Sequence, residues 1–267
     1  MTKSKFFIIL VLILGVSATM MSQEGNSKVS LNAGADFMSR YVWRGTQFGG
    51  NAPSIQPAIS LAAGNFEIGV WGAFSTAGAN VGQEVDLYVS YSFLNEMFTA
   101  TLTDYFFPAE GVNYDYFEYS KDKTGHILEG ALSFNGTEKI PLSLLLAVNF
   151  YGADAARIND DPNSADFNKK DGIQLSSYAE LGYATAVNDV SLDVFMGFNL
   201  TAPKKADPSI GYDGEAGFYG DKFGVVNLGV SASKSIEITE RFSLPIQASL
   251  ITNPMNKRIF FVFGFSL

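Results

Sequence analysis

The chain has no cysteine among its 267 residues, which excludes disulfide bonds and the acylated cysteine of a lipoprotein. It has a single histidine, so a hydrolase of the serine–histidine–acid type would depend entirely on His126. Charged residues make up 17% of the sequence, below the roughly 25% of a typical soluble domain. Beyond the first residues no run of about 18 apolar residues occurs, so we expect no transmembrane helix in the mature chain.

Aromatic and hydrophobic side chains are abundant instead. Hydrophobic residues reach 47% and aromatic residues 14%, with 23 Phe and 12 Tyr. The formal net charge is −9, and this excess of acid disfavours nucleic acid and anionic lipid as partners. We expect no cofactor, no metal ion and no catalytic residues, and therefore no enzyme.

The first residues have the form of a secretion signal. Lys3 and Lys5 precede an apolar run over residues 6–16, which is too short to serve as a lasting membrane-spanning helix. Small residues then predict cleavage after Ala18 or Ser22. We therefore expect a signal peptide over residues 1–22 and one domain over residues 23–267; an uncleaved anchor helix is the alternative. Loss of the two lysines would change the formal charge from −9 to −11.

The last residues of the chain alternate with a period of two. Phe261, Phe263, Phe265 and Leu267 fall on one face of an extended strand, and smaller residues fall on the other. Such an aromatic strand would be prone to aggregation in water. The pattern instead suits a membrane β-barrel, in which a strand pairs with neighbours on both sides and turns its aromatic face to lipid.

The same alternation recurs along the mature chain and predicts an all-β fold. We expect a transmembrane antiparallel up-and-down β-barrel of about twelve strands, each about ten residues long. Short turns alternate with longer polar loops, as in outer-membrane barrels. The expected strands cover residues 28–42, 54–63, 66–75, 85–93, 97–107, 127–134, 142–151, 174–184, 190–201, 225–233, 242–251 and 259–267.

Three residues do not fit a regular barrel. Pro57 and Pro245 lie within expected strands, where each removes a hydrogen bond, so we expect β-bulges there. Asp104 falls on the apolar face of its strand, near the end that leads into a long loop. A bulge or the lipid headgroup zone would accommodate its charge.

The period alone leaves the inner face undetermined, because a soluble barrel would turn its apolar face inward. Three features favour lipid on the outside. Twelve strands enclose more space than inward side chains readily fill. The apolar set carries almost no charge, and aromatic residues gather near strand ends, as in the two interfacial girdles of membrane barrels. We therefore expect the protein in the cell outer membrane, in contact with outer-membrane lipids.

Ionisable residues on the inward face are the candidate site, since such groups in membrane proteins tend to line water or pair with each other. One interpretation is a hydrated lumen that prefers cations. The other is a set of ion pairs that plugs the barrel, for example Arg40 with Asp36 or Glu67. The predicted pore-lining residues are Asp36, Arg40, Arg44, Glu67, Asp86, Glu129, Glu180 and Asp193.

Two further features have simple interpretations. The acidic stretch at residues 160–163, with Asp166, lacks the ligand spacing and glycine of a calcium loop, so we expect a solvated loop. His126, beside a glycine at the end of its strand, is expected to be an ordinary surface residue.

Several motifs resemble the TorF-type family, whose members carry a provisional porin label. They occur in order over nearly the whole mature chain, at residues 39–45 (Ser-Arg-Tyr-Val-Trp-Arg-Gly), 56–58, 69–72, 103–108 and 249–265. The resemblance implies a Gram-negative outer-membrane barrel with no established substrate and no catalytic residues to transfer. Barrel-assembly machinery commonly recognises a terminal aromatic residue, and the final residue here is Leu267, which leaves Phe263 and Phe265 as the signal.

The sequence thus predicts a channel for passive diffusion of small hydrophilic solutes or ions, with a mild preference for cations. The alternative is a closed structural or adhesion barrel that binds a surface partner through its long loops. A barrel enzyme acting on lipid is a third possibility, which the single histidine disfavours. The oligomeric state is not predicted.

Overall fold

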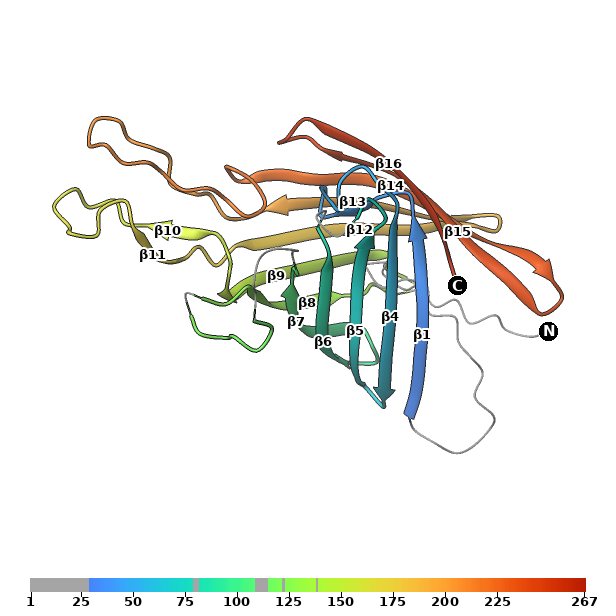
Figure 1. Ribbon diagram of the computed structural model, residues 1–267. Helices are drawn as coiled ribbons and strands as arrows, with labels where there is room; N and C mark the ends of the chain where they lie inside the picture. Colours follow the sequence, from blue (N-terminus) through green and yellow to red (C-terminus); the bar gives the residue numbers. More distant parts are fainter. Residues whose placement is uncertain (1–28, 79–81, 109–114, 122, 138) are drawn as a thin grey trace.

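The computed structural model describes residues 29–78, 82–108, 115–121, 123–137 and 139–267. Within these residues the fold is all-β, with twelve strands in one closed antiparallel barrel (Figure 1). The expected fold class and the expected number of strands are therefore confirmed. No helix in the described part of the chain has the length and apolar character needed to cross a bilayer. The expected signal peptide lies outside the described residues.

Neighbouring strands in the chain are neighbours in the wall, apart from two small hairpins that belong to the connections. β2 (Tyr41–Trp43) pairs with β3 (Thr46–Phe48), and β10 (Ala156–Ile158) pairs with β11 (Lys170–Ile173). The wall consists of β1 (Val29–Met38), β4 (Ser54–Ala63), β5 (Phe66–Ser75), β6 (Glu84–Phe93), β7 (Phe98–Phe106), β8 (His126–Phe134), β9 (Leu142–Gly152), β12 (Ser177–Val187), β13 (Val190–Asn199), β14 (Gly224–Thr239), β15 (Phe242–Asn253) and β16 (Arg258–Ser266).

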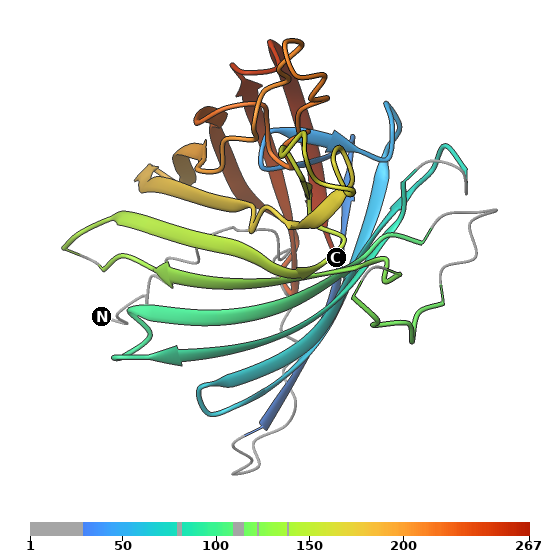
Figure 2. The same cartoon turned by 90° about the vertical axis from the view of Figure 1, so that its left-hand side faces the viewer.

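The barrel closes where the first strand meets the last. β1 and β16 pair over Asp36–Met38 and Gly264–Ser266, and backbone hydrogen bonds between Ala35 and Leu267 extend the contact. In Figure 2, β14–β16 form one wall and β4–β8 form the wall opposite. Phe37 stacks on Phe265 across this junction, with ring centroids 5.0 Å apart. The terminal strand therefore takes the closing position that its sequence predicts.

Short and long connections alternate around the barrel, as expected, except that the connection between β15 and β16, at the end with the long loops, is also short. The turns after β4, β6, β8, β12 and β14 are short, and some require left-handed backbone: Gly64 has φ 61° and Asn188 has φ 56°. The connections after β1, β5, β7, β9 and β13 are longer. We call the two ends of the barrel the turn end and the loop end.

The apolar side chains face outward and the polar side chains face the interior. Phe261 is 58% exposed on the outer face, whereas its neighbour Val262 on the inner face is 4% exposed. Asp36, Ser60, Glu129, Asn199 and Asn227 are among the buried polar residues, while large apolar residues of every wall strand are exposed. The orientation expected from the alternating pattern is thus the one observed.

The bulges expected at Pro57 and Pro245 are absent. Pro57 sits in unshifted register with Ala35 of β1, and the bridge to β5 is interrupted only at residues 56–57. Pro245 keeps its register with Ser235 of β14, at a point where pairing with β16 has ended, so its missing N–H costs no bond on that side. The wall bulges lie elsewhere, between Leu128 and Glu129, Gly197 and Phe198, and Glu237 and Thr239.

The first wall strand also ends earlier than expected, at Met38 instead of residue 42. Residues 41–48 leave the wall and fold into the barrel as the β2–β3 hairpin, which we call the inner hairpin. The alternating pattern continues through Tyr41–Trp43 because these residues form a strand of their own, not because the wall continues.

Candidate functional site

The inner hairpin packs tightly against the far wall of the barrel. Its turn has left-handed backbone at Arg44 (φ 47°) and Gly45 (φ 75°). A Cβ atom at Gly45 would lie 1.9 Å from the carbonyl oxygen of Val226 on β14, so no larger residue fits there. Tyr41 and Trp43 are both buried, and the Trp43 ring meets the Tyr105 ring edge-on at 5.5 Å. The glycine therefore lets the hairpin reach across the interior and touch β14.

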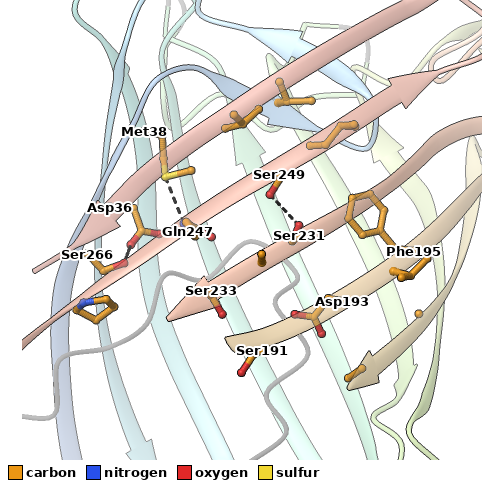
Figure 3. A pocket seen from close by; sticks show the side chains of 18 of the residues that line it. Asp36, Met38, Ser191, Asp193, Phe195, Ser231, Ser233, Gln247, Ser249 and Ser266 are labelled. Carbon is orange, nitrogen blue, oxygen red and sulfur yellow. Dashed lines mark hydrogen bonds between the residues drawn. The ribbon is translucent and has the colours of Figure 1, made fainter. Parts of the chain in front are cut away.

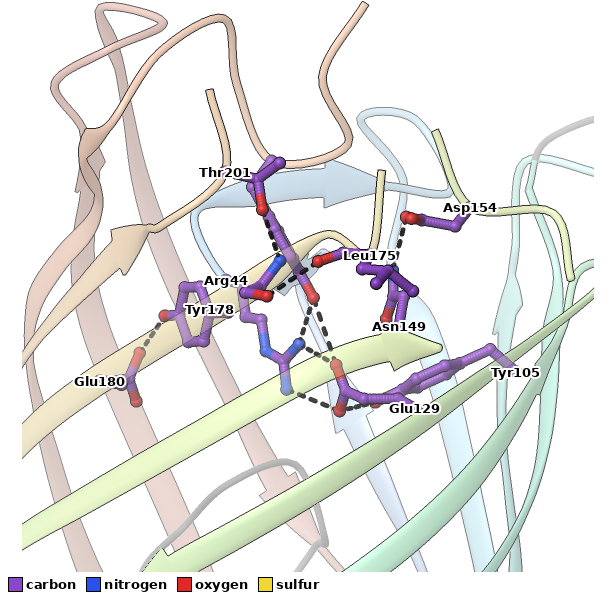
Figure 4. Close-up of polar contacts among 11 residues, drawn as sticks. Arg44, Tyr105, Glu129, Asn149, Asp154, Leu175, Tyr178, Glu180 and Thr201 are labelled. Carbon is purple, nitrogen blue, oxygen red and sulfur yellow. Dashed lines mark hydrogen bonds and ion pairs between the residues drawn. The ribbon is translucent and has the colours of Figure 1, made fainter. Parts of the chain in front are cut away.

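Arg44 carries the main polar contact of the inner hairpin (Figure 4). Its Nη1 and Nη2 donate to the two carboxylate oxygens of Glu129 on β8, the Nη2 bond being 2.9 Å long. Both side chains are nearly inaccessible, at 4% and 2% exposure. Tyr105 donates to Glu129 over 3.0 Å, and Tyr219 contacts both members of the pair. This bidentate, desolvated pair joins the hairpin to the wall.

Aromatic rings surround the ion pair. The Arg44 guanidinium lies over Trp43 at 4.4 Å and over the Tyr178 ring at 4.5 Å from each centroid. Tyr178 is fully buried, and it donates a hydrogen bond to Glu180. The buried apolar cluster inside the barrel comprises Tyr41, Trp43, Trp71, Ala73, Tyr105, Ile127, Leu145, Ala147, Tyr178, Tyr219 and Val226. These residues come from both walls, so the interior is packed like a protein core at this level.

Buried polar side chains complete the packed region toward the loop end. Asn199 donates to the carbonyl oxygens of Thr201 and Lys222, each over 2.8 Å, and so fixes the long loop after β13. Asp154, just after β9, accepts bonds from Asn149 at 3.1 Å and from the Ser176 backbone at 3.0 Å. These hydrogen bonds hold the first residues of the loops after β9 and β13 against the wall.

A cavity with a volume of about 560 Å³ occupies the interior on the turn side of the packed region (Figure 3). Hydroxyl and carboxyl groups share the lining with apolar side chains such as Met38 and Phe195. Ser266 donates to Asp36 over 2.6 Å, and the hydroxyls of Ser231 and Ser249 are 2.7 Å apart. The lining continues to residues beside the short turns, among them Asn135 and Asp189. The cavity therefore extends from the inner hairpin to the turn end.

The structure divides the eight predicted pore-lining residues into three groups. Asp36, Arg40, Arg44, Glu180 and Asp193 line the cavity. Glu129 is buried in its pair with Arg44, so it belongs to the packed region. The remaining two lie on the wall near other polar groups: Glu67 accepts a hydrogen bond from Tyr88 over 2.6 Å, and Asp86 is buried beside Glu84. The role of these residues in a pore stays a prediction.

The interior does contain an ion pair, but not one of the two suggested as examples from the sequence. Arg40 donates to Gln47 over 3.2 Å, Asp36 bonds to Ser266, and Glu67 bonds to Tyr88. Arg44 and Glu129 form the buried pair instead. Their separation of 85 positions gives no local signal of the contact.

His126 is not the surface residue expected from the sequence, since it is fully buried. Its ring lies between Phe106 and Tyr119, 4.7 Å and 4.1 Å away, on the outer face near the loop end. Nδ1 is 2.7 Å from Asp104, and Nε2 is 2.7 Å from the carbonyl oxygen of Tyr116. The misfit of Asp104 is thus resolved by a partner on the adjacent strand, without a register shift between β7 and β8.

The two longest described loops form a joint surface at the loop end. They cover residues 153–176, with β10 and β11, and residues 200–223; we call them the outer loop unit. Asn168 donates to Gly211 over 2.8 Å and accepts from the Asp213 backbone over 3.0 Å. Lys204 pairs with Asp160 at 2.7 Å, and this hydrogen bond lowers the pKa of the Asp160 carboxyl group. Within the described residues no group of three His, Cys, Asp or Glu side chains could hold a metal ion.

Together these features define a closed up-and-down β-barrel with an apolar exterior and a polar, partly packed interior. The chain belongs to a bacterial protein family of unknown function (Gcw_chp), whose family model matches residues 22–214. This segment includes the inner hairpin and both members of the Arg44–Glu129 pair. No curated protein matches the chain. The family description names no activity, so the channel function expected from the sequence stays a prediction.

Proposed function

We propose that the protein is a porin-like channel of the outer membrane, and not an enzyme. It would admit small hydrophilic solutes or ions by passive diffusion, with a mild preference for cations, and its resting form would be closed by the inner hairpin. The observation that carries the proposal is a closed barrel with an exposed apolar outer face and an interior cavity whose lining includes hydroxyl and carboxyl groups beside apolar side chains.

The outer face supports placement in a membrane. Exposed aromatic residues lie near the turn end, among them Phe66, Tyr91 and Phe242, as expected for rings at a lipid–water interface. A closed barrel satisfies its backbone hydrogen bonds internally, which is a condition for spanning a bilayer with strands. Placement in the outer membrane of a Gram-negative cell, with assembly through the C-terminal strand, follows from the TorF-type resemblance.

The cavity supports passage of polar solutes, and the inner hairpin supports closure. Asp36, Glu180 and Asp193 face the cavity, and Arg44 is neutralised by its pair with Glu129. Fixed carboxylates around water attract cations more than anions. The packed region closes the interior between the cavity and the loop end, and the inner hairpin contributes Tyr41 and Trp43 to it. Conduction would therefore require displacement of the inner hairpin.

The test removes the hairpin without removing the wall. Met38 and Ser54 are direct partners in the β1–β4 ladder, so a two-residue Asn-Gly turn can replace residues 39–53. In planar bilayers we expect a conductance at least about tenfold above that of the natural chain, and a reversal potential that favours cations. Adding Asp36→Asn and Asp193→Asn should reduce that preference. A folded, shortened barrel that conducts no ions would refute the channel.

A second candidate is favoured by the outer loop unit. Its two loops are fastened to each other by Asn168 and by the Lys204–Asp160 pair, which gives a defined surface instead of two independent loops. A closed barrel that binds a surface partner through this unit would need such order. Replacing Asn168 by alanine should then lower binding of the protein to bacterial or host-cell surfaces by several-fold, as judged by flow cytometry with labelled protein in lipid nanodiscs. Equal binding by both proteins would count against this candidate.

A further inference from the structure

Two carboxyl groups on β6 lie outside the cavity on which the proposed channel depends. Glu84 and Asp86 occupy alternate positions, so both point into the barrel, and they are 3% and 5% exposed. Their partners across the β5–β6 ladder are Ala73 and Trp71, which carry no charge. The two acids therefore lie side by side in the packed region of the barrel.

The polar groups around the pair come from β2 and β7. Tyr41 of the inner hairpin hydrogen-bonds to Glu84, Glu84 hydrogen-bonds to Asp86, and Asp86 accepts a bond from the Phe106 backbone. The nearby titratable groups on β7 are Asp104 and Tyr105. No ion pair among the described residues includes either acid. One oxygen of each, Glu84 Oε2 and Asp86 Oδ1, is buried without a hydrogen-bond partner.

This arrangement is not stable with two bare negative charges. A hydrogen bond between two carboxyl groups needs a proton on one of them, and two buried carboxylates in contact repel strongly. Their free oxygens are hard donors of the kind that bind alkali-metal ions and protons. A single positive charge between the two carboxyl groups would offset the repulsion. A proton would form the hydrogen bond between them, whereas an alkali-metal ion could also contact the two unpartnered oxygens.

We propose that Glu84 and Asp86 form a binding site for one monovalent cation, a proton or an alkali-metal ion, and that the occupied site holds the inner hairpin through Tyr41. Loss of the cation leaves two adjacent carboxylates beneath the Tyr41 hydroxyl, and the hairpin loosens. The site is a property of the folded barrel and does not depend on channel activity.

The chain supplies its own reporter, because its two tryptophans are Trp43 on the inner hairpin and Trp71 opposite Asp86. In the Trp71→Phe variant, folded in detergent micelles, Trp43 is the only fluorophore of its kind. Raising the pH from about 5 to about 9 at low salt should shift its emission to the red and increase quenching by acrylamide about twofold. Ordinary carboxyl groups titrate mostly below this range and phenols mostly above it, whereas histidine is a side-chain type that titrates within it. The single histidine, His126, bonds to Asp104, so the variant described next, which retains it, serves as the control.

Adding Glu84→Gln and Asp86→Asn removes the site while keeping the shape of both side chains, so emission should stay blue throughout. The matched control is Glu67→Gln, an inward acid that bonds to Tyr88, and it should behave like the parent. The protein with both natural tryptophans provides the same readout if Trp71→Phe does not fold.

Two additions to the protein at about pH 9, of salt and of acid, distinguish an alkali-metal ion from a proton as the bound cation. Restoration of blue emission by sodium or potassium chloride, but not by choline chloride at equal ionic strength, identifies an alkali-metal ion as a ligand. Restoration only by acid identifies the proton. The proposal is overturned if the parent shows no pH dependence, or if the Glu84→Gln/Asp86→Asn protein follows the parent.

Discussion

Replacing Arg44 by alanine is expected to cost about 3–5 kcal/mol of folding free energy, because it leaves the Glu129 carboxylate buried without its counter-charge. The substitution also removes the guanidinium from between Trp43 and Tyr178, so the inner hairpin loses its polar anchor and part of its packing. Urea unfolding in detergent micelles, followed by tryptophan fluorescence, measures the loss. Ion conductance in bilayers should rise in parallel.

Arg40 is the matched control for this prediction. It precedes the same hairpin and lines the same cavity, but it is half-buried and its contact is a single hydrogen bond to Gln47. Arg40→Ala should cost about 1 kcal/mol or less. The double variant Arg44→Met/Glu129→Leu should recover most of the loss, since apolar residues of similar volume often replace a buried pair without penalty. Equal losses for Arg44→Ala and Arg40→Ala would contradict the anchoring role of the pair.

Placing an arginine on the outer face at Val89 is expected to destabilise the membrane-inserted barrel by about 2–4 kcal/mol. Val89 lies at mid-strand, 39% exposed, between the outward residues Ile68 and Leu102 of the neighbouring strands. Under the proposed membrane placement, the charge of the introduced arginine would face the acyl chains of the lipids. Refolding into lipid vesicles at graded urea concentrations gives the change in free energy.

The neighbouring residue supplies the comparison. Ser90→Arg puts the same side chain one position along β6, on the inner face and opposite Glu67, where water or the carboxylate can accommodate it. We expect a loss of less than about 1 kcal/mol at Ser90. If Ser90→Arg were the more damaging of the two substitutions, the outer face would not be in contact with lipid.

The wall of the barrel could be predicted from local sequence because one physical rule governs it. Each strand alternates apolar and polar residues, so the order of strands and the closing role of residues 259–267 follow from period two. The choice of the outward face also needed the near absence of charge from the apolar set and the aromatic residues near strand ends. The prolines cause no bulges because the hydrogen bond that a proline lacks matters only on a side that has a paired neighbour. That depends on where adjacent strands end, which local sequence does not reveal.

The interior could be predicted only in part. Inward parity identified both arginines and most of the acids, but not Glu84, because the strand was expected to begin one residue later. Tyr41 and Trp43 continue the alternation past the point where the chain leaves the wall. Gly45 is the one local sign of the hairpin turn. The reason for a glycine at this position, the close approach of its backbone to Val226, is visible only in the three-dimensional structure. His126 and Asp104 had a signal that was missed, because both fall on the outward parity of neighbouring strands, within diagonal reach.

The cavity and the packed region follow one another along the barrel axis, the cavity toward the turn end and the packed region toward the loop end. The two ends of the interior therefore differ in their access to solutes. Under the proposed channel function, solutes on the turn side would enter the cavity and leave again, whereas those on the loop side would meet the packed region. Under the proposed outer-membrane placement, the resting molecule would be a blind vestibule facing the periplasm. If the inner hairpin were then displaced, the cavity would already hold solutes from the periplasm. The first solute to cross would therefore leave the cell.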